Sequence, residues 1–558
     1  MKLLSRIIIL TSVALAGCVS CVETDPLIGG NLIPIESQYQ IFSTEIPIDK
    51  MEMRMADSLS GYSSTRILLG AVRDDSYGLS TRSCALTLIP LIDTLNFGNI
   101  QSVKSFHLHA TFDTTAVSQN GQEHILQNVY AFALDEGTDW SKMMDANDVA
   151  GLIKHGTASV IKGTPLINGS SDLDLEFTTD YARAYLDYLN GKDLSDSTVF
   201  QAFLKKFPGI WLETDVPAGN GGRLNSFDLQ MKFNTQSYYL EDNYGSFTIN
   251  SIFDPAVGPV DTTFYFYAGA HEYFKPATLF KDYSSTEFPQ YAFNVTGHST
   301  RTLAGAASDK VYVEGGAGLK PVVAAKTLID LAKKCIGDTL AANNLDAGLI
   351  SKVQINKATV VMPYDMPGDY TLVDKYFPPR LSPTCRIRTD TTSTFMGLTD
   401  ASSENENQGD INRSICAYTP DISYHLQQLL SIKEDNDNLL RGNYDIWMLV
   451  MGLEETTTTS QGNSDLSEYY QYLAYQSYYN SMYGGYGGYG GYGYGGYGSN
   501  YYSNYYSYMM AAMYAGGQTT TSTDYKLDKD FYYRATLCGP ASSTEVPKLR
   551  LTFSVPRK

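Results

Sequence analysis

Alternation of apolar and polar residues with a period of two recurs along the chain and predicts β-strands. The segment 103–112 (VKSFHLHATF) has the pattern of a strand with one buried face. The segment 353–362 (VQINKATVVM) is the clearest strand in the sequence. Further strand-like runs bounded by turn residues lie at 39–47, 65–72, 83–90, 128–134, 209–214, 226–233, 262–268, 444–451 and 549–555.

Short helical segments are inserted among these strands rather than alternating with them. The spacing of apolar residues, caps and stops predicts helices at 145–155, 179–189, 197–207, 322–335 and 422–432. This arrangement argues against a doubly wound parallel sheet. We therefore predict a mainly β protein built from antiparallel β-sandwich or jelly-roll units with short inserted helices.

The N-terminus has a different pattern, which is typical of export. Basic residues precede an apolar run at 7–16, and Leu15-Ala16-Gly17 leads into Cys18. A basic start, a short apolar run and small residues describe a secretory signal peptide. The run is shorter than the about 20 apolar residues that span a membrane. An ordinary secreted protein, cleaved nearby with Cys18 incidental, is the alternative to the interpretation that follows.

Leu-Ala-Gly-Cys resembles the bacterial lipobox, in which the cysteine is acylated and becomes the first mature residue. We predict a lipoprotein signal peptide at 1–17, lipidation of Cys18 and a lipidated tether at 18–38. Glu23 and Asp25 follow the cysteine, as in some surface-exported lipoproteins. The predicted location is the outer membrane, lipid-anchored, with the cell surface favoured over the periplasmic face.

The remaining chain is long enough for several domains. We predict a first β-sandwich domain with helical insertions at 39–305 and a second at 306–558. Residues 469–523 carry no charge and repeat a Gly-Gly-Tyr unit, which predicts a disordered low-complexity insertion within the second domain. Its tyrosines form a candidate interaction tract, although a tolerated loop expansion is the favoured interpretation. They are Tyr483, Tyr486, Tyr489, Tyr492, Tyr494 and Tyr497.

Charge and cysteine content narrow the classes of partner. The formal net charge is −19, which disfavours nucleic acid and an anionic membrane surface and leaves the lipid as the means of attachment. The chain has seven cysteines, and none of those after the processing site forms a Cys-x-x-Cys pair. Because an oxidising envelope permits disulfides without requiring them, one or two disulfides and free buried thiols both remain open.

The sequence carries no recognisable catalytic signature. It has no Gly-x-Ser-x-Gly elbow, His-Glu-x-x-His pair, phosphate-binding loop or dinucleotide-binding glycine pattern. His107 and His109 share one face of a predicted strand, and this spacing can present two metal ligands, but a polar strand face is the favoured interpretation. Trp140, Trp211 and Trp447 are expected to be core or loop anchors. We predict a protein that is not an enzyme and has no cofactor or metal.

Several phrases in matching order carry a family resemblance. They are 26–34 (PLIGGNLIP), 100–108 (IQSVKSFHL), 207–212 (FPGIWL), 355–362 (INKATVVM), 533–540 (YRATLCGP) and 547–554 (PKLRLTFS). Together they resemble a Bacteroidota family of outer-membrane lipoproteins of unknown function, from which the Gly-Gly-Tyr insertion departs. The resemblance implies a relation to accessory lipoproteins of the barrel-assembly machinery, and no functional residue can be carried over from it.

Two functions follow as hypotheses. The first is a structural accessory subunit of an outer-membrane complex, with an outer-membrane β-barrel or other lipoproteins as partners. The second is a surface glycan-binding module or adhesin that uses the tyrosine tract.

Overall fold

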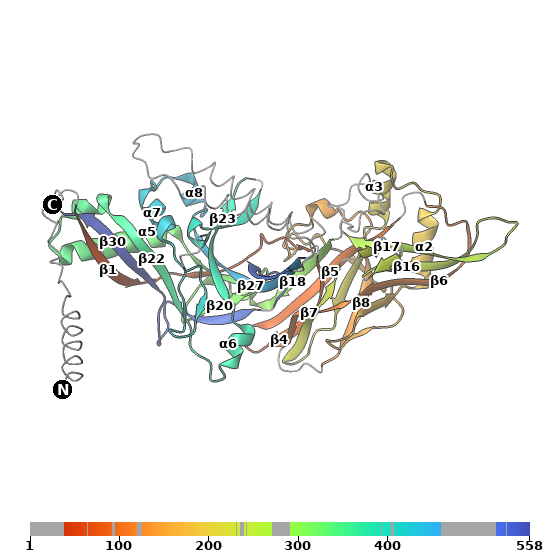
Figure 1. Ribbon diagram of the computed structural model, residues 1–558, viewed down its shortest axis with the longest axis horizontal. Coiled ribbons are helices and arrows are strands. Elements are labelled where there is room, and N and C mark those ends of the chain that lie inside the picture. Colours follow the sequence, from red (N-terminus) through yellow and green to blue (C-terminus); the bar gives the residue numbers. More distant parts are fainter. Residues whose placement is uncertain are drawn as a thin grey trace, which may run out of the picture.

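The computed structural model confirms a mainly β protein with antiparallel sheets (Figure 1). It describes residues 38–557 except 64, 92–94, 120–124, 230–231, 235–238, 242, 270–290, 391, 403–406, 459–519 and 532. Every strand pair among the described residues is antiparallel. The molecule is elongated and consists of two units, each with its own hydrophobic core.

The terminal unit is formed by residues 39–55 together with 305–557, so both ends of the described chain belong to it. Strand β1 pairs with β30 over nine residues, from Tyr39–Pro556 to Pro47–Lys548. The strands are β1 (Tyr39–Pro47), β2 (Glu52–Met55), β19 (Gly305–Ala306), β20 (Lys310–Glu314), β21 (Leu319–Val323), β22 (Gln354–Pro363), β23 (Arg380–Arg388), β24 (Ser393–Gly397), β25 (Ile411–Asn412), β26 (Ala417–Tyr418), β27 (Ile446–Thr458), β28 (Thr520–Leu527), β29 (Arg534–Cys538) and β30 (Lys548–Pro556). The helices are α5 (Ala325–Ala342), η6 (Ala347–Lys352), α6 (Thr371–Tyr376), η7 (Thr399–Ser402), α7 (Ser423–Ser431) and α8 (Asp437–Leu440).

Two sheets of the terminal unit share one core. Both sheets contribute buried apolar side chains to this core, as do helices α5 and α7. One is the five-stranded sheet β1-β30-β22-β26-β25, and the other is the seven-stranded sheet around β21, β27 and β23. The run Ile446-Trp-Met-Leu-Val450 on β27 is buried throughout, as expected for a strand covered on both faces. This arrangement agrees with the sandwich that the alternation predicts.

The inserted unit is formed by residues 60–303, between β2 and β19. Its strands are β3 (Tyr62–Ser63), β4 (Arg66–Asp74), β5 (Gly78–Pro90), β6 (Asn99–Ala110), β7 (Phe112–Gln119), β8 (Gln127–Leu134), β9 (His155–Ser159), β10 (Leu166–Ile167), β11 (Leu173–Glu176), β12 (Ile210–Thr214), β13 (Gly221–Asp228), β14 (Lys232–Asn234), β15 (Tyr239–Glu241), β16 (Gly245–Ile252), β17 (Val260–Gly269) and β18 (Ala292–His298). Its helices are η3 (Trp140–Lys142), α2 (Thr179–Leu189), α3 (Ser197–Lys206) and η5 (Ser299–Leu303).

Strand β5 organises the inserted unit because it is long enough to pair with four others. Its first half pairs with β4 and β18, and its second half pairs with β12 and β17. It therefore runs from the contact with the terminal unit toward the outer part of the inserted unit (Figure 1). Helices α2 and α3 cover the core, with Tyr185, Leu186 and Phe203 fully buried.

The observed pairing differs from the predicted domain assignment in one respect. The prediction placed 39–305 in one domain, but β1 and β2 pair with β30 and β21, and Ile48, Met51 and Met53 lie in the core of the terminal unit. Pairing over this sequence distance leaves no local signal in the sequence. The inserted unit is thus an insertion between two strands of the terminal unit, not an N-terminal domain.

Two predicted helices also need correction. Residues 145–154 form turns and irregular backbone instead of a helix, and His155 begins β9. Asp148 has a left-handed φ of 43°, and its carboxylate accepts the N–H groups of Leu152 and Ile153. The helix predicted at 322–335 starts later and ends later, as α5, because Val322 and Val323 pair with β27. The helices at 179–189, 197–207 and 422–432 are present as α2, α3 and α7.

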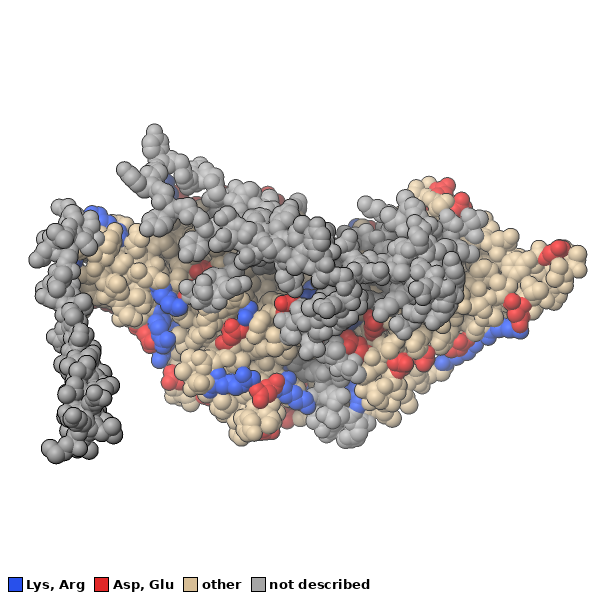
Figure 2. Space-filling view, in the orientation of Figure 1, with Lys and Arg blue, Asp and Glu red and all other residues tan. Residues whose placement is uncertain are grey.

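The described surface has no large patch of one charge on the face drawn in Figure 2, where acidic and basic side chains are interspersed. Cys84, Cys335, Cys385, Cys416 and Cys538 are all free thiols, and only Cys416 is not buried. Among the described residues, no helix has both the length and the apolar character that a membrane crossing requires.

Candidate functional site: a buried charged joint

The two units meet at a cluster of buried ionisable side chains, which we call the joint. It consists of Arg82, His298, Glu314, Lys320 and Asp528, and each residue is less than one-tenth exposed. The first two lie on β5 and β18 of the inserted unit, and the others belong to the terminal unit. Since a buried charge is costly unless it is paired, five such residues at one contact need a specific arrangement of partners.

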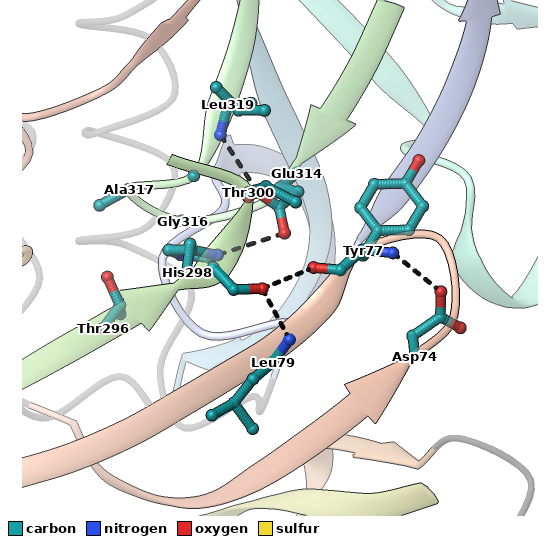
Figure 3. A network of polar contacts seen from close by, with 12 residues as sticks. Asp74, Tyr77, Leu79, Thr296, His298, Thr300, Glu314, Gly316, Ala317 and Leu319 are labelled. Atoms are coloured by element: carbon teal, nitrogen blue, oxygen red, sulfur yellow. Dashed lines mark hydrogen bonds and ion pairs between the residues drawn. The ribbon is translucent and has the colours of Figure 1, made fainter. Parts of the chain in front are cut away.

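Glu314 is the centre of the hydrogen-bonding network in Figure 3. Its Oε1 lies 3.3 Å from His298 Nδ1, and its Oε2 accepts from the Thr300 hydroxyl and from the Leu319 N–H. Burial alone would raise the pKa of Glu314, but its contacts with His298 and Thr300 hold the pKa below the ordinary value. The carboxylate is therefore ionised, and both of its oxygens are engaged by protein donors.

His298 complements this carboxylate as a neutral donor. Burial lowers its pKa, although Glu314 opposes the change, so the ring is uncharged near neutral pH. A neutral ring that donates Nδ1–H to Glu314 leaves a lone pair on Nε2. This lone pair is buried and accepts no hydrogen bond among the described residues, which costs less than an unpaired N–H would in a charged ring.

Lys320 is fully buried, and its ammonium group is surrounded by backbone carbonyls. Its Nζ donates to the carbonyl of Glu314, to Gly316 O at 2.9 Å and to Gly318 O at 3.2 Å. These three acceptors match the three N–H bonds of a protonated lysine. Burial lowers the pKa of Lys320 to about 7, and the charges of Glu314 and Asp528 oppose this decrease.

Asp528 follows β28 and is held against the 315–318 turn. Its Oδ1 accepts the Phe531 N–H at 2.8 Å, and its backbone carbonyl accepts the Gly316 N–H at 3.1 Å. Among the described residues its Oδ2 accepts no hydrogen bond, and burial raises its pKa to about 7, although Arg82 and Lys320 oppose the increase. Gly315 has to be glycine here, since a Cβ at this position would collide with the Asp528 carboxylate.

The turn between β4 and β5 makes further contacts between the inserted unit and the terminal unit. Asp74 pairs with Arg534 of β29 at 2.7 Å, and the Tyr77 hydroxyl lies 3.0 Å from Thr536 Oγ1. Tyr77 also contacts the ring of Tyr312 edge-on, with the centroids 5.5 Å apart. Figure 3 shows this turn beside the Glu314 network, to which a serine hydroxyl at position 299 connects it.

A second ion pair crosses the contact farther along β4. Arg66 donates from Nε to Asp113 at 2.7 Å and from Nη1 to Asp530 of the terminal unit at 2.8 Å. All three side chains are less than one-fifth exposed, which makes the pairing stronger than an ordinary surface ion pair. The joint and this flanking pair can hold two bodies in one relative arrangement, and this is the chemical task that they fit best.

The residues singled out from the sequence do not belong to the joint. Cys18 and the tyrosine tract from Tyr483 to Tyr497 lie outside the described residues. Of the predicted tract 469–523, the structure describes only the last residues, from Thr520 in β28. The tract connects β27 to β28, which pair with each other up to Thr458–Thr520, so it is inserted within a hairpin of the terminal unit.

The histidine pair and the three tryptophans singled out from the sequence lie within the described residues. His107 and His109 lie on one face of β6, as predicted. Trp140, Trp211 and Trp447 are all buried, which confirms that they are core residues. Sequence reasoning missed the joint because its members are distant in sequence. The one local signal is the glycine-rich segment from Glu314 to Lys320, which places two opposite charges on either side of a tight turn.

Comparisons of the chain with protein-family models, with curated proteins and with solved structures found no match.

Proposed function

We propose that the protein is a lipid-anchored, non-catalytic structural subunit of an outer-membrane complex, with the barrel-assembly and surface lipoprotein machinery as the leading candidate. The observation that carries this proposal is the joint. Both Glu314 oxygens contact the inserted unit, through His298 Nδ1 and the Thr300 hydroxyl. The three Lys320 N–H bonds stay within the terminal unit and fix the 314–318 turn that presents Glu314. A fixed arrangement of two bodies is what a spacer or docking subunit needs.

The position of the predicted anchor supports the same function. Strand β1 begins at Tyr39, directly after the predicted tether 18–38, and lies at one end of the elongated molecule (Figure 1). The inserted unit forms the opposite end. A tether of about 20 residues reaches at most roughly 70 Å, so the terminal unit would be held close to the lipid and the inserted unit presented away from it.

An exposed apolar edge next to the tether offers a contact surface for a partner. Strand β1 is the last strand of its sheet, so one side of its backbone pairs with no other strand among the described residues. Tyr39 is 52% exposed and Ile41 is 68% exposed. An unpaired strand edge can form backbone hydrogen bonds with a strand of another protein, and exposed apolar side chains beside it favour such binding.

Two substitutions test attachment and docking separately. Cys18→Ala should release the protein from the membrane fraction if the lipid is the anchor. Ile41→Arg should leave it in the membrane but weaken its recovery with a partner in mild detergent. Val257→Arg is the matched control, because Val257 is equally exposed at 70% but lies on the inserted unit. Equal partner recovery for Ile41→Arg and wild type would remove β1 from the proposed interface.

A further inference from the structure

Two histidines and two acidic residues converge on the surface of the inserted unit, and none of them belongs to the joint. His107 and His109 lie on β6, and Asp174 and Glu176 lie on the neighbouring strand β11. We propose that this cluster is a binding site for a divalent transition metal of the zinc class. This proposal does not depend on the proposed function.

The strand register places the four side chains together. His109 is directly opposite Asp174, and His107 is directly opposite Glu176, so all four project from the same face of the two-strand ribbon. His109 Nδ1 lies 2.8 Å from Asp174 Oδ1, and His107 Nε2 lies 3.2 Å from the same oxygen. One ligand atom from each of these three residues lies within 4.8 Å of the others. One ion can therefore be reached by all three after small side-chain rotations.

The donor set fits the proposed metal. Two imidazole nitrogens and one carboxylate oxygen are ligands that zinc and its neighbours in the periodic table prefer. Three protein ligands leave one position of a tetrahedral site for water. The imidazoles and Glu176 are about one-third exposed and Asp174 is 58% exposed, so an ion and its water can enter without any backbone movement.

Glu176 provides a carboxylate for the ring nitrogen of His107 that faces away from the metal, a partner that metal-binding histidines commonly have. His107 directs Nε2 toward the shared Asp174 oxygen, while its Nδ1 faces Glu176 Oε2 at 3.7 Å. A carboxylate behind the second ring nitrogen orients the imidazole and favours metal binding at the first nitrogen. Glu176 itself is held by Lys162 at 3.2 Å and by the Phe106 N–H at 3.2 Å. It is therefore a positioning residue, and the three ligands are His107, His109 and Asp174.

The site has a structural consequence for the inserted unit. Strand β11 has four residues, is the last strand of its sheet and pairs with β6 alone among the described strands. A metal ion bound by His107, His109 and Asp174 would tie this edge strand to its neighbour. Metal binding should therefore raise the thermal unfolding temperature, because a ligand that binds only the folded state stabilises it.

The test is calorimetric titration of the detergent-purified full chain with zinc chloride near neutral pH, after treatment with a chelator. We expect one ion per chain. The variants are His107→Asn with His109→Asn, and Asp174→Asn alone. Loss of an outer-contact residue costs about 10–100-fold in metal affinity, so loss of a ligand should cost more than about 100-fold. His155→Asn is the control, since His155 lies on β9, stacks on Phe132 and belongs to no such cluster among the described residues.

Cobalt substitution provides a readout that does not depend on affinity. Co²⁺ bound by two imidazoles and a carboxylate with four- or five-fold coordination should produce visible absorption that the double variant lacks and the His155→Asn variant retains. No uptake by the wild type, or equal uptake by the wild type and the double variant, would overturn the proposal. Because these measurements use the isolated protein, a negative result leaves the proposed function in the envelope untouched.

Discussion

Replacing the buried carboxyl of the joint should make the stability of the protein less sensitive to pH. Asp528→Asn keeps an acceptor for the Phe531 N–H but removes the ionisable group. In the folded protein burial raises the pKa of Asp528 to about 7, whereas an aspartate in an unfolded chain has a pKa of about 4. Between these values the folded state keeps a proton that the unfolded state has lost.

The sign and size of the effect follow from proton linkage. A raised folded pKa stabilises the protein fully below the unfolded pKa, and this contribution is lost as the pH rises through the folded pKa. Well inside this window each pH unit changes the free energy of unfolding by about 1.4 kcal/mol, and the slope halves where the pH reaches the folded pKa. From pH 5 to pH 7 wild type should therefore lose roughly 2 kcal/mol through this group. The pKa of Lys320 in the folded protein is lowered to about 7. This group therefore makes the free energy of unfolding rise with pH, and only above about pH 7, so it does not act in the window used here.

Urea unfolding at several pH values between 5 and 7 measures this difference, and the buried tryptophans Trp140 and Trp447 provide the fluorescence signal. The free energy of unfolding of Asp528→Asn, relative to wild type, should improve by roughly 2 kcal/mol across the window. Thr296→Val is the control, because Thr296 is buried beside the joint but does not titrate. A difference between Asp528→Asn and wild type that stays constant with pH would refute the reasoning.

Three further changes have defined outcomes. Gly315→Ala places a Cβ against the Asp528 carboxylate and should lower the free energy of unfolding by about 1–3 kcal/mol, measured by thermal unfolding. An unchanged unfolding temperature would contradict this and show that the turn can relax. Trp447→Ala should cost about 3–5 kcal/mol in chemical denaturation, because the side chain is fully buried; a cost near zero would contradict that burial. Replacing residues 459–519 by a short hairpin turn should stabilise the protein by about 2 kcal/mol through a smaller loop-closure entropy. Loss of the folded state would show that the segment supports the fold, and loss of glycan binding would favour the adhesin hypothesis.

The sequence predicts the elements whose signals are local. Helix α2 matches its prediction because Thr178 caps the Tyr181 N–H, and α3 begins where Asp196 caps Thr198 and Val199. The strand at 39–47 has the predicted bounds. The prediction fails at 145–155, where the backbone N–H groups of Asn147 and Leu152 donate to the carboxylates of Asp145 and Asp148 instead of to helix carbonyls.

Features that depend on distant pairing could not be predicted. Strand β1 pairs with β30 at the other end of the chain, and no local pattern shows that the inserted unit lies between two strands of one sheet. Apart from Glu314 and Lys320, the members of the joint come from separate segments, so the cluster as a whole has no common signal in the sequence. At the proposed metal site His107 and His109 are visible as a pair, but Asp174 joins them only through the register of β6 with β11.

The central claim is that this protein is a subunit of an outer-membrane complex, and affinity purification tests it most directly. A C-terminally tagged full chain is recovered from membranes in mild detergent, and the co-purifying proteins are identified and quantified by mass spectrometry. The Cys18→Ala variant serves as the control for attachment. The account predicts an outer-membrane β-barrel protein and other lipoproteins in fixed ratio with the wild type. Recovery of the tagged protein alone would contradict it.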